Sequence, residues 1–407
     1  MSDFAPSRGT RDLLPPDGSV MRAVYDRAAE IARLHGFRYV ETPGFEATEV
    51  FARTSGATSD VVSKEMYTFT DRGDRSLTLR PEGTAPVVRA YLNDRQRLGV
   101  PFKAYYLTRM YRYSRPQAGR YREHRQFGVE VLGTDAPGAD VEVMAVGDAL
   151  LRSLGLARYH VELNSLGDET CRPAYREVLL TYLRDHRHEL RDEHKDRFED
   201  NPLRVLDCKD EACRAVAAGA PAMIDHLCDD CRAAFDAVRE GLAAAGIEAV
   251  LTPTLVRGLD YYTRTTFEFQ DEAIGAQSTI CGGGRYDGLI ETIGGPPTPG
   301  IGFGAGIERL QLSLGKPDLP PDEIDVFFVV DEGGDRAQVI ATMAQLRARG
   351  LACDTDYAGR SKKGQLTQAG RLGAKTVVVV DADGARIFRQ GGDEPTSLAE
   401  LAATLGA

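Results

Sequence analysis

The sequence lacks the features that mark membrane, secreted and low-complexity proteins. No apolar run approaches the roughly 20 residues that cross a bilayer. Residues 1–6 have neither a basic start nor an apolar core, so they do not resemble a signal peptide. Internal repeats and low-complexity tracts are missing, and the seven cysteines are not arranged as the framework of a small secreted domain. We therefore expect a cytoplasmic protein that does not contact membranes.

The two common nucleotide-binding motifs are missing as well. There is no Walker A sequence, and the glycine run at residues 300–306 fails the G-x-G-x-x-G spacing because Ile307 occupies the last position. The small residues of this run would still let a backbone approach a nucleotide closely. An ATP site in this chain would therefore have to be built on arginines.

Basic residues are concentrated in two segments, although the net charge is −11. Residues 101–125 contain seven Lys and Arg against one acidic residue, and residues 355–375 contain five against one. Basic patches on an acidic body are typical of a protein that binds a polyanion at selected places. For the second segment, solvated surface charge is an equally good explanation.

The length of the chain predicts more than one domain, because 407 residues are too many for one ordinary core. Residues 168–250 are charge-rich, helical in pattern and hold five of the seven cysteines, as expected of an insertion in a catalytic domain that spans residues 1–320. After a linker at Lys316–Pro321, strands and helices alternate over residues 324–407. This alternation predicts a small α/β domain with a largely parallel sheet.

Hydrophobic spacing and turn residues predict the individual elements. In the first part of the chain, helices are expected at residues 18–36, 85–98 and 138–154, and strands at 37–43, 102–114, 120–133 and 261–269. In the last part, strands at 324–330, 351–357 and 376–380 alternate with helices at 335–349 and 362–372.

The hairpin strand at residues 120–133 carries polar side chains in an otherwise apolar pattern. Alternation places Gln126, Gly128 and Glu130 on one face. We expect Gly128 to leave a gap between the two polar side chains, as in the floor of a ligand site; a solvent-facing strand edge is the alternative. Arg112 is expected on the opposing strand, and arginine suits phosphate or carboxylate recognition.

Two further segments carry polar residues beside glycines. Glu82 and Thr84 flank a glycine directly after a short strand, which suits an ammonium group, although such a sequence is also a common surface turn. Arg309 lies off the apolar stripe of the helix that follows the glycine run.

The segment Arg257–Phe269 combines an arginine with two tyrosines. We expect a turn at Gly258 and a strand from about Tyr261, so that Arg257 and Tyr262 can share one face. A cation with two hydroxyl partners suits a small polar ring. Tyrosines of the core and its rim are the alternative.

These segments, in this order, resemble histidyl-tRNA synthetase, a class II aminoacyl-tRNA synthetase. The resemblance implies an α+β fold: a class II catalytic domain built on an antiparallel sheet with a helical insertion, followed by an α/β anticodon-binding domain at 324–407. It also implies a homodimer, with the segment that ends at Pro43 at the interface. It extends over nearly the whole chain and rests on residues 8–15, 102–133, 257–269, 281–286 and 300–310.

The resemblance also implies roles for individual residues. Arg112 would bind the ATP α-phosphate and the histidine carboxylate, Arg257 the α-phosphate, and Arg309 the γ-phosphate. The remaining roles concern the amino acid: the α-amino group would be held by Glu82, Thr84 and Gln126, and the imidazole by Glu130 and Tyr262, with Tyr261 and Tyr286 closing the pocket.

The implied activity is ATP-dependent formation of histidyl-adenylate, followed by transfer of histidine to the 3′ end of its tRNA. The implied partners are L-histidine, ATP with Mg²⁺, and the tRNA. The loop Arg115–Arg125 would approach the acceptor end, where phosphate contacts position the nucleic acid.

One residue departs from the family pattern and keeps alternatives open. The position two residues after Arg112 is usually acidic and is Ser114 here, so an active synthetase with weak ATP binding is one alternative. A second is a non-catalytic histidine-sensing regulatory subunit of ATP phosphoribosyltransferase, which usually lacks the C-terminal domain. A third is a class II synthetase for another amino acid, which the Arg257–Phe269 segment disfavours.

The cysteines of the insertion allow a metal site without requiring one. A zinc site of four thiolates is possible, with Cys171 as a further candidate. Free thiols in a reducing compartment are the favoured expectation, and the active site itself is expected to hold no metal through protein ligands. The four candidate thiolates are Cys208, Cys213, Cys228 and Cys231.

Overall fold

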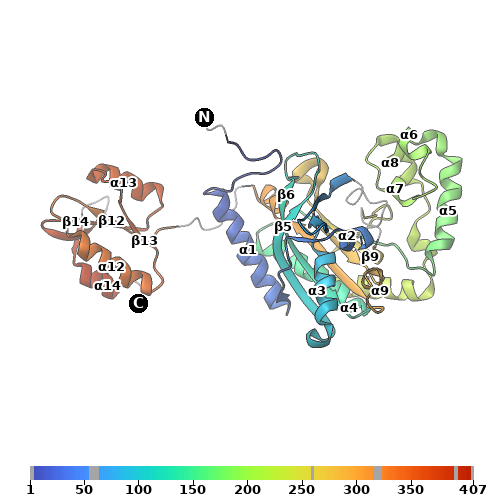
Figure 1. Ribbon diagram of the computed structural model, residues 1–407, viewed down its shortest axis with the longest axis horizontal. Helices are drawn as coiled ribbons and strands as arrows, with labels where there is room; N and C mark the ends of the chain where they lie inside the picture. Colours follow the sequence, from blue (N-terminus) through green and yellow to red (C-terminus); the bar gives the residue numbers. More distant parts are fainter. Residues whose placement is uncertain (1–3, 55–63, 258–260, 316–322, 389–392, 405–407) are drawn as a thin grey trace. The chain divides into compact units, whose positions relative to one another are not determined.

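The computed structural model divides the chain into two compact units (Figure 1). One comprises Met1–Asp12 and Val24–Pro317, and the other comprises Leu13–Ala23 and Asp318–Ala407. In the part of the chain that the structure describes, no helix is long and apolar enough to cross a membrane. The structure describes residues 4–54, 64–257, 261–315, 323–388 and 393–404.

The larger unit is built on an eight-stranded sheet of order β1-β5-β6-β11-β10-β9-β7-β8. The pairings from β5 to β7 are antiparallel, whereas β1 and β8 pair in parallel at the two edges. The predicted α+β fold with an antiparallel catalytic sheet is therefore confirmed. The strands are β1 (Arg38–Tyr39), β5 (Phe102–Tyr111), β6 (Glu123–Leu132), β7 (His160–Ser165), β8 (Ala249–Leu251), β9 (Thr263–Gln270), β10 (Thr279–Arg285) and β11 (Gly300–Gly306).

Several strands are shorter than their sequence patterns predicted. The strand expected at 37–43 has only the two residues of β1. The Val40 amide donates to the Tyr105 carbonyl at 2.8 Å, and beyond this bond the chain turns away from the edge of the sheet. β9 begins at Thr263, two residues later than predicted, opposite a register shift in β10. The first predicted helix is confirmed as α1 (Asp17–Leu34).

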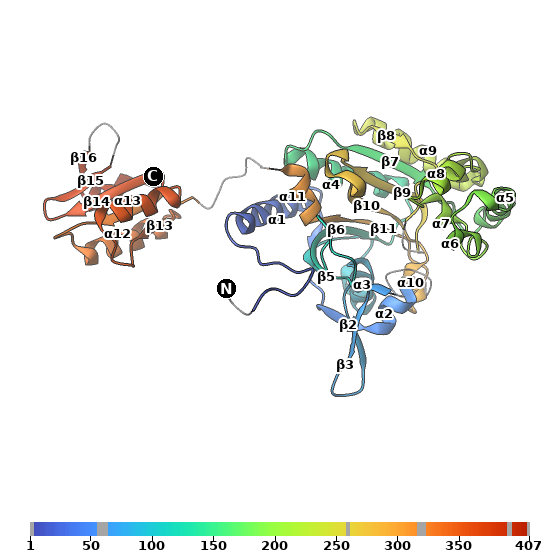
Figure 2. The ribbon, with the colours of Figure 1, turned by 90° about the horizontal axis from the view of Figure 1, so that it is seen from above.

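Two long helices cover opposite faces of the sheet (Figure 2). α3 (Thr84–Leu98) stacks Tyr91 on Phe102 of β5, with ring centroids 5.7 Å apart. α4 (Pro137–Ser153) packs on β6, β10 and β11 and approaches β9 closely, since a Cβ at Gly147 would lie 3.0 Å from the Phe269 ring. Both helices match their predictions. The sheet face under α3 is the one that carries the polar residues discussed below.

Three short strands and several small helices complete this unit outside the segment between β7 and β8. The strands form a second sheet of order β2-β4-β3, which delivers the chain to the start of α3. The elements are β2 (Phe45–Ala47), α2 (Thr48–Thr54), β3 (Tyr67–Thr70), β4 (Ser76–Leu79), α10 (Leu289–Thr292) and α11 (Ile307–Leu314).

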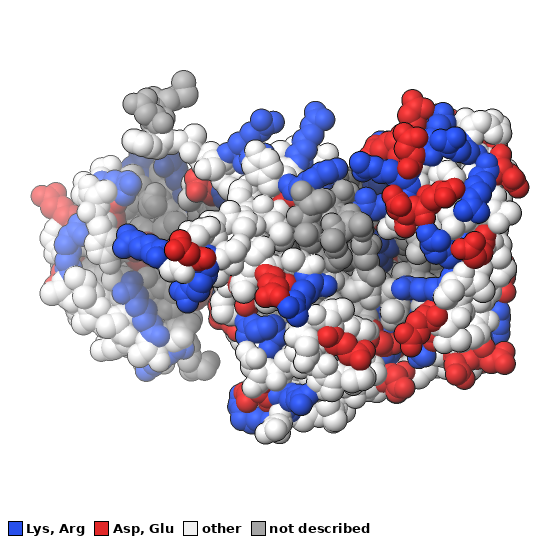
Figure 3. Space-filling model, turned by 45° about the vertical axis from the view of Figure 1, so that its right-hand side comes forward, with Lys and Arg blue, Asp and Glu red and all other residues white. Residues whose placement is uncertain are grey.

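The segment between β7 and β8 is mostly helical, as its sequence pattern predicted. Its last helix, α9 (Asp229–Ala244), packs against α4, where a Cβ at Gly241 would lie 2.6 Å from the Val141 side chain. Basic and acidic side chains are interspersed over this segment on the face in Figure 3, so it presents no continuous basic surface there. Its other helices are α5 (Arg172–Asp185), α6 (Asp192–Lys195), α7 (Leu203–Leu206) and α8 (Glu211–Ala218).

The smaller unit has a five-stranded sheet of order β13-β12-β14-β15-β16, in which the first three strands are parallel. β12 is buried on both faces: Phe328 packs in one apolar cluster and Phe327 in another. The predicted α/β pattern is confirmed, while the linker at 316–321 lies outside the described residues. The elements are β12 (Val326–Val330), α12 (Arg336–Ala348), β13 (Cys353–Thr355), α13 (Lys362–Arg371), β14 (Thr376–Asp381), β15 (Gly384–Ile387), β16 (Glu394–Thr396) and α14 (Leu398–Thr404).

Candidate active site

The floor of the site is formed where β6 lies beside the glycine-rich strand β11. The register pairs Glu130 with Gly302 and Gln126 with Gly306. A Cβ at Gly302 would collide with the Glu130 carboxylate, and one at Gly304 would collide with the Gln126 amide. The glycines of β11 therefore make room for the polar side chains of β6, which lie across the neighbouring strand.

The expected gap at Gly128 is occupied by a tyrosine. Tyr106 of β5 pairs directly with Gly128, and its ring fills the space above both Gly128 and Gly83, where a Cβ would collide with it. The prediction of an open gap is therefore wrong, and Tyr106 is a site residue that the sequence reasoning missed. The pairing register of the hairpin would have revealed Tyr106, because residues directly opposite each other, such as Tyr106 and Gly128, point to the same face of the sheet.

The cluster of side chains around Glu130 on this sheet face is called the tyrosine pocket below, and Glu130 itself is fully buried. Its carboxylate accepts hydrogen bonds from Thr84 Oγ1 at 2.8 Å and from the Tyr286 hydroxyl. Burial raises the pKa of Glu130 to about 8, although these hydrogen bonds act in the opposite direction. At neutral pH the ligand-free pocket therefore holds a largely protonated carboxyl group.

Glu82 is the second buried carboxylate of the pocket. It accepts hydrogen bonds from the backbone amides of Thr84 at 2.7 Å and Ala85 at 2.9 Å, at the first turn of α3. Burial raises its pKa, and the two amides and Arg112 oppose that effect. The helix start thus fixes the position of Glu82 and supplies partial positive charge beside it.

Three tyrosines enclose the space over Glu130. The Tyr261 ring lies 4.6 Å from that of Tyr262 and 5.8 Å from that of Tyr286, measured between ring centroids. Tyr262 and Tyr286 are buried. The structure therefore brings these predicted residues together with Glu82, Thr84 and Glu130, although their binding roles remain a prediction.

Arg257 lies flat on the sheet beside this pocket. It forms an ion pair with Glu268 of β9, and a Cβ at Gly282 would lie 2.6 Å from its Nη1 atom. The Arg257 guanidinium carbon lies 5.7 Å from the centroid of the Tyr262 ring, so the two share one face as predicted. The turn expected at Gly258 lies outside the described residues. Glu268, which fixes Arg257, has no distinct signal in the sequence.

Four arginines line a cavity of about 320 Å³, and Arg257 is the residue that connects this cavity to Tyr262. Arg112 lies one residue beyond the end of β5, where its amide donates to the Arg122 carbonyl at 2.9 Å and so continues the pairing of the hairpin. Its Nε donates to the Pro81 carbonyl at 2.7 Å, and Arg309 Nη1 donates to the Thr279 carbonyl at 2.7 Å. The cavity is lined by Arg112, Arg120, Arg257 and Arg309, together with Gln126.

The electrostatics of this cavity favour an anion. Burial and the neighbouring guanidinium groups lower the pKa of Arg309 to about 10. Burial and the charges of Arg112, Arg309 and Arg120 lower the pKa of His124 to about 3, so this imidazole is neutral. Ser114 also lines the cavity, and its buried hydroxyl has no hydrogen-bond partner among the described residues. A polyanion would relieve the repulsion among these cations.

The candidate zinc ligands do not form one four-thiolate site. Cys208 and Cys213 lie with His194, whereas Cys228 and Cys231 lie with Asp168 and Cys171. The single four-thiolate cluster that the spacing allowed as a possibility is therefore contradicted. Cys208 and Cys213 lie just before and within α8, whereas Cys228 and Cys231 lie at the start of α9, and the fold brings each pair to different partners.

Comparisons with known proteins find similarity to histidyl-tRNA synthetases. The family model described as Histidyl-tRNA synthetase matches residues 9–168 and 186–310. A curated Histidine--tRNA ligase from Rhodococcus erythropolis is 49% identical over 383 residues, covering 93% of this chain and 90% of that protein. One from Caldanaerobacter subterraneus subsp. tengcongensis is 47% identical over 377 residues, covering 92% and 90%. The crystal structure of apo S. aureus histidyl-tRNA synthetase has a TM-score of 0.81 at 35% identity, covering 99% of this chain and 100% of that chain.

Proposed function

This chain belongs to the histidyl-tRNA synthetase family, and from that premise we propose how its residues carry out the reaction. The enzyme is an aminoacyl-tRNA ligase that activates L-histidine with ATP and transfers histidine to the 3′ end of its tRNA. Curated relatives that are 47% and 49% identical over more than 90% of the chain are histidine–tRNA ligases, which disfavours the alternative of a regulatory subunit of ATP phosphoribosyltransferase.

The observation that carries the mechanism is the convergence of Arg112, Arg257 and Arg309 on one cavity beside the tyrosine pocket. In the first step, the histidine carboxylate attacks the α-phosphorus of ATP, an O–P bond forms, and the bond to pyrophosphate breaks. A carboxylate needs no general base, so the site has to position two anions and stabilise charge on the phosphoryl oxygens. Arg112 and Arg257 would do so at the α-phosphate, and Arg309 would bind the γ-phosphate.

The tyrosine pocket would select histidine through its ring nitrogens. Glu130 would accept a hydrogen bond from one ring N–H, and the Tyr262 hydroxyl would pair with the other nitrogen. Tyr261 and Tyr286 would close over the ring. Amino acids without these nitrogens would leave buried polar groups unpaired and would be rejected.

The opposite end of the substrate would be held near the start of α3. Glu82, Thr84 and Gln126 would bind the α-amino group. The Glu82 carboxylate is already fixed by two backbone amides, so a bound ammonium group would meet a preorganised acceptor.

Mg²⁺ would enter with ATP rather than on a dedicated set of protein ligands. Glu308 is the carboxylate among the cavity-lining residues, and Arg125 already donates to it through its backbone amide at 2.9 Å. Glu308 could supply one oxygen ligand, with phosphate oxygens and water supplying the others. The ion would add positive charge at the phosphates during the displacement.

The tRNA would contact both units, with residues 324–407 at the anticodon and the Arg115–Arg125 loop near the acceptor end. Support for the C-terminal patch is weaker than its composition suggested, because several of its cations have carboxylate partners. Arg360 pairs with Asp356 at 2.6 Å, and Lys362 pairs with Asp331 at 3.2 Å.

A cytoplasmic homodimer is the proposed assembly. β1 is an edge strand of the large sheet, and apolar side chains near it are exposed, including Tyr39, Phe45 and Val100. A second copy of the chain at this edge would cover them. Sedimentation at several protein concentrations measures the assembly directly; a monomer throughout would contradict it.

The test of the reaction is ATP–pyrophosphate exchange with each of the twenty amino acids. We expect exchange with histidine alone and its loss in Arg257→Ala. Arg109→Ala is the matched control, because Arg109 is an exposed arginine of the same hairpin and should leave exchange unchanged. Histidine binding without exchange would restore the regulatory-subunit alternative, and exchange with another amino acid would overturn the specificity.

A further inference from the structure

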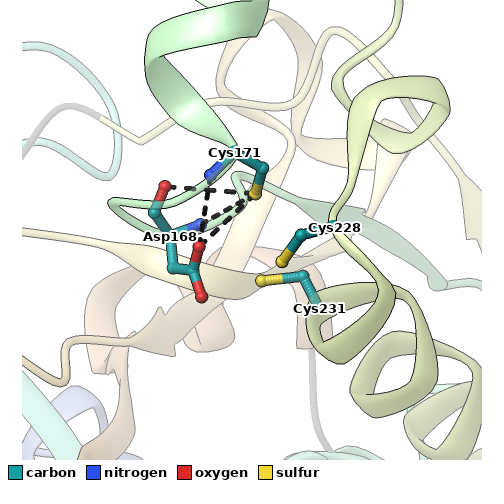
Figure 4. Close-up of side chains that lie close together, drawn as sticks. All are labelled: Asp168, Cys171, Cys228 and Cys231. Carbon is teal, nitrogen blue, oxygen red and sulfur yellow. Dashed lines mark hydrogen bonds between the residues drawn. The ribbon is translucent and has the colours of Figure 1, made fainter.

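The insertion holds a compact cluster of one carboxylate and three thiols, and we propose that it is a structural zinc site. The ligand atoms of Asp168, Cys171, Cys228 and Cys231 all lie within 4.8 Å of one another (Figure 4). In a tetrahedral site with Zn–S bonds of about 2.3 Å, neighbouring sulfurs lie roughly 3.8 Å apart. Small side-chain adjustments would therefore bring all four ligands onto one ion.

The ligands come from two segments that the fold brings together. Asp168 and Cys171 lie in the loop that opens the insertion, and Cys228 and Cys231 lie at the start of α9 with the C-x2-C spacing of many zinc sites. Gly167 has a φ of +60°, and a Cβ there would lie 2.7 Å from Cys171 Sγ. The loop backbone thus supports the Cys171 sulfur, which lies 3.5 Å from Asp168 Oδ1.

Charges around the cluster suit a bound zinc ion. Three thiolates and a carboxylate around Zn²⁺ would carry a net charge of about −2. Arg264 Nη2 lies 3.2 Å from Asp168 Oδ2, which leaves the other carboxylate oxygen facing the sulfurs. Arg172, which is partly buried beside Cys171 and Cys231, supplies a second positive charge. These arginines would act as the outer partners that orient the ligands and compensate their charge.

Two other interpretations explain fewer of the residues. A disulfide between Cys228 and Cys231 would leave the buried thiol of Cys171 beside them without a role. The second cluster, His194 with Cys208 and Cys213, offers three ligand residues rather than four. Cys171 and Cys231 are also nearly fully buried, as expected of ligands in a closed structural site.

The site would connect the insertion to the histidine pocket. Arg172, the first residue of α5, donates to the Leu166 carbonyl at 2.9 Å and to the Tyr262 carbonyl. Zinc would hold the start of α5 against α9, which packs on α4 behind the catalytic sheet. Its removal would therefore loosen the backbone at Tyr262, a consequence that rests on the proposed role of Tyr262 in binding histidine.

The first experiment measures metal content and does not depend on activity. The full-length protein, purified under reducing conditions without chelator, is incubated with zinc, desalted and analysed by elemental mass spectrometry. We expect the double variant Cys228→Ser/Cys231→Ser to lose about one zinc per chain relative to the wild-type protein. The matched variant Cys208→Ser/Cys213→Ser should keep the zinc ion bound at Asp168. A wild-type protein that binds no zinc, a Cys228→Ser/Cys231→Ser variant with the wild-type content, or a Cys228–Cys231 disulfide in the fresh protein would overturn the proposal.

A milder variant keeps the test valid if the double variant fails to fold. Cys171→Ser retains the C-x2-C pair, and it should change the visible absorption of the cobalt-substituted protein because one thiolate ligand is lost. An unchanged cobalt spectrum would exclude Cys171 as a ligand. Chelation of the wild-type protein should raise the KM for histidine several-fold more than the KM for ATP, and zinc should restore it. If bound zinc is confirmed but the KM does not change, the site stands and only its connection to Tyr262 is wrong.

Discussion

The tyrosine pocket and the arginine cavity share one sheet face but have opposite electrostatics. In the pocket, burial holds the Glu130 carboxyl largely protonated, with a pKa of about 8. In the cavity, crowded guanidinium groups keep His124 neutral, with a pKa of about 3. Burial disfavours charged side chains in both the pocket and the cavity, but only the cavity keeps an excess of positive charge, which its four arginines supply. The site thus has one end suited to a small polar ring and another suited to a polyanion.

The largest expected effect comes from removing charge at the arginine end. Arg309→Ala should lower kcat for ATP–pyrophosphate exchange by about 10²–10³-fold, because a preorganised cation at the phosphates is lost. Histidine binding in the absence of ATP should change little. Titration calorimetry with histidine, beside the exchange assay, measures both effects. A comparable loss of histidine affinity would show that the two ends are not separable.

A substitution of Glu130 should have the opposite effect: it should weaken histidine binding and leave ATP binding nearly unchanged. Glu130→Gln keeps the size of the side chain and its contact with Thr84 but removes the ionisable group. We expect the KM for histidine to rise about 10- to 100-fold, the range for leaving a buried polar group unpaired, with the KM for ATP nearly unchanged. Gln126→Glu is a useful counterpart, since it adds a charge beside the arginines. Equal increases in both KM values for Glu130→Gln would contradict the comparison.

The protonation of Glu130 predicts how the stability of the ligand-free protein depends on pH. Its folded-state pKa of about 8 lies above the usual value of 4.5, so the folded protein binds the extra proton between these two values. Stability from this group is complete below pH 4.5 and is lost as the pH rises through 8. Between pH 6 and 8 the loss should be about 2 kcal/mol in the free energy of unfolding. Urea unfolding of wild type and Glu130→Gln across this range measures it; parallel curves would contradict the assigned pKa.

The smallest effect is expected at the position that departs from the family pattern. The Ser114 hydroxyl is buried in the cavity without a hydrogen-bond partner among the described residues. Ser114→Glu would place the usual acidic residue there, and we expect a several-fold lower KM for ATP, equivalent to about 1 kcal/mol. Ser76→Glu, at an exposed serine of β4, is the control. A higher KM would show that the serine is adapted to this cavity.

Particular residues show how far sequence reasoning reached. Alternation placed Gln126 and Glu130 on one face, and their motif context brought in Arg112, Arg257 and Arg309, which do line one cavity. Tyr106 was missed because its importance depends on which residue lies opposite it. The sequence allowed Cys208, Cys213, Cys228 and Cys231 to form one group, but the structure separates them into two. Spacing along the chain does not reveal which distant segments lie side by side.

The sequence by itself determined the order of elements, the antiparallel sheet and the family, because hydrophobic periodicity and short motifs are local properties of the chain. Only the tertiary structure decided that β11 glycines yield space to β6 side chains, that Tyr106 fills the position above Gly128, and that Asp168 joins Cys171, Cys228 and Cys231. These arrangements depend on strand register and helix packing between distant segments. Their energies arise from contacts that exist only after the chain has folded.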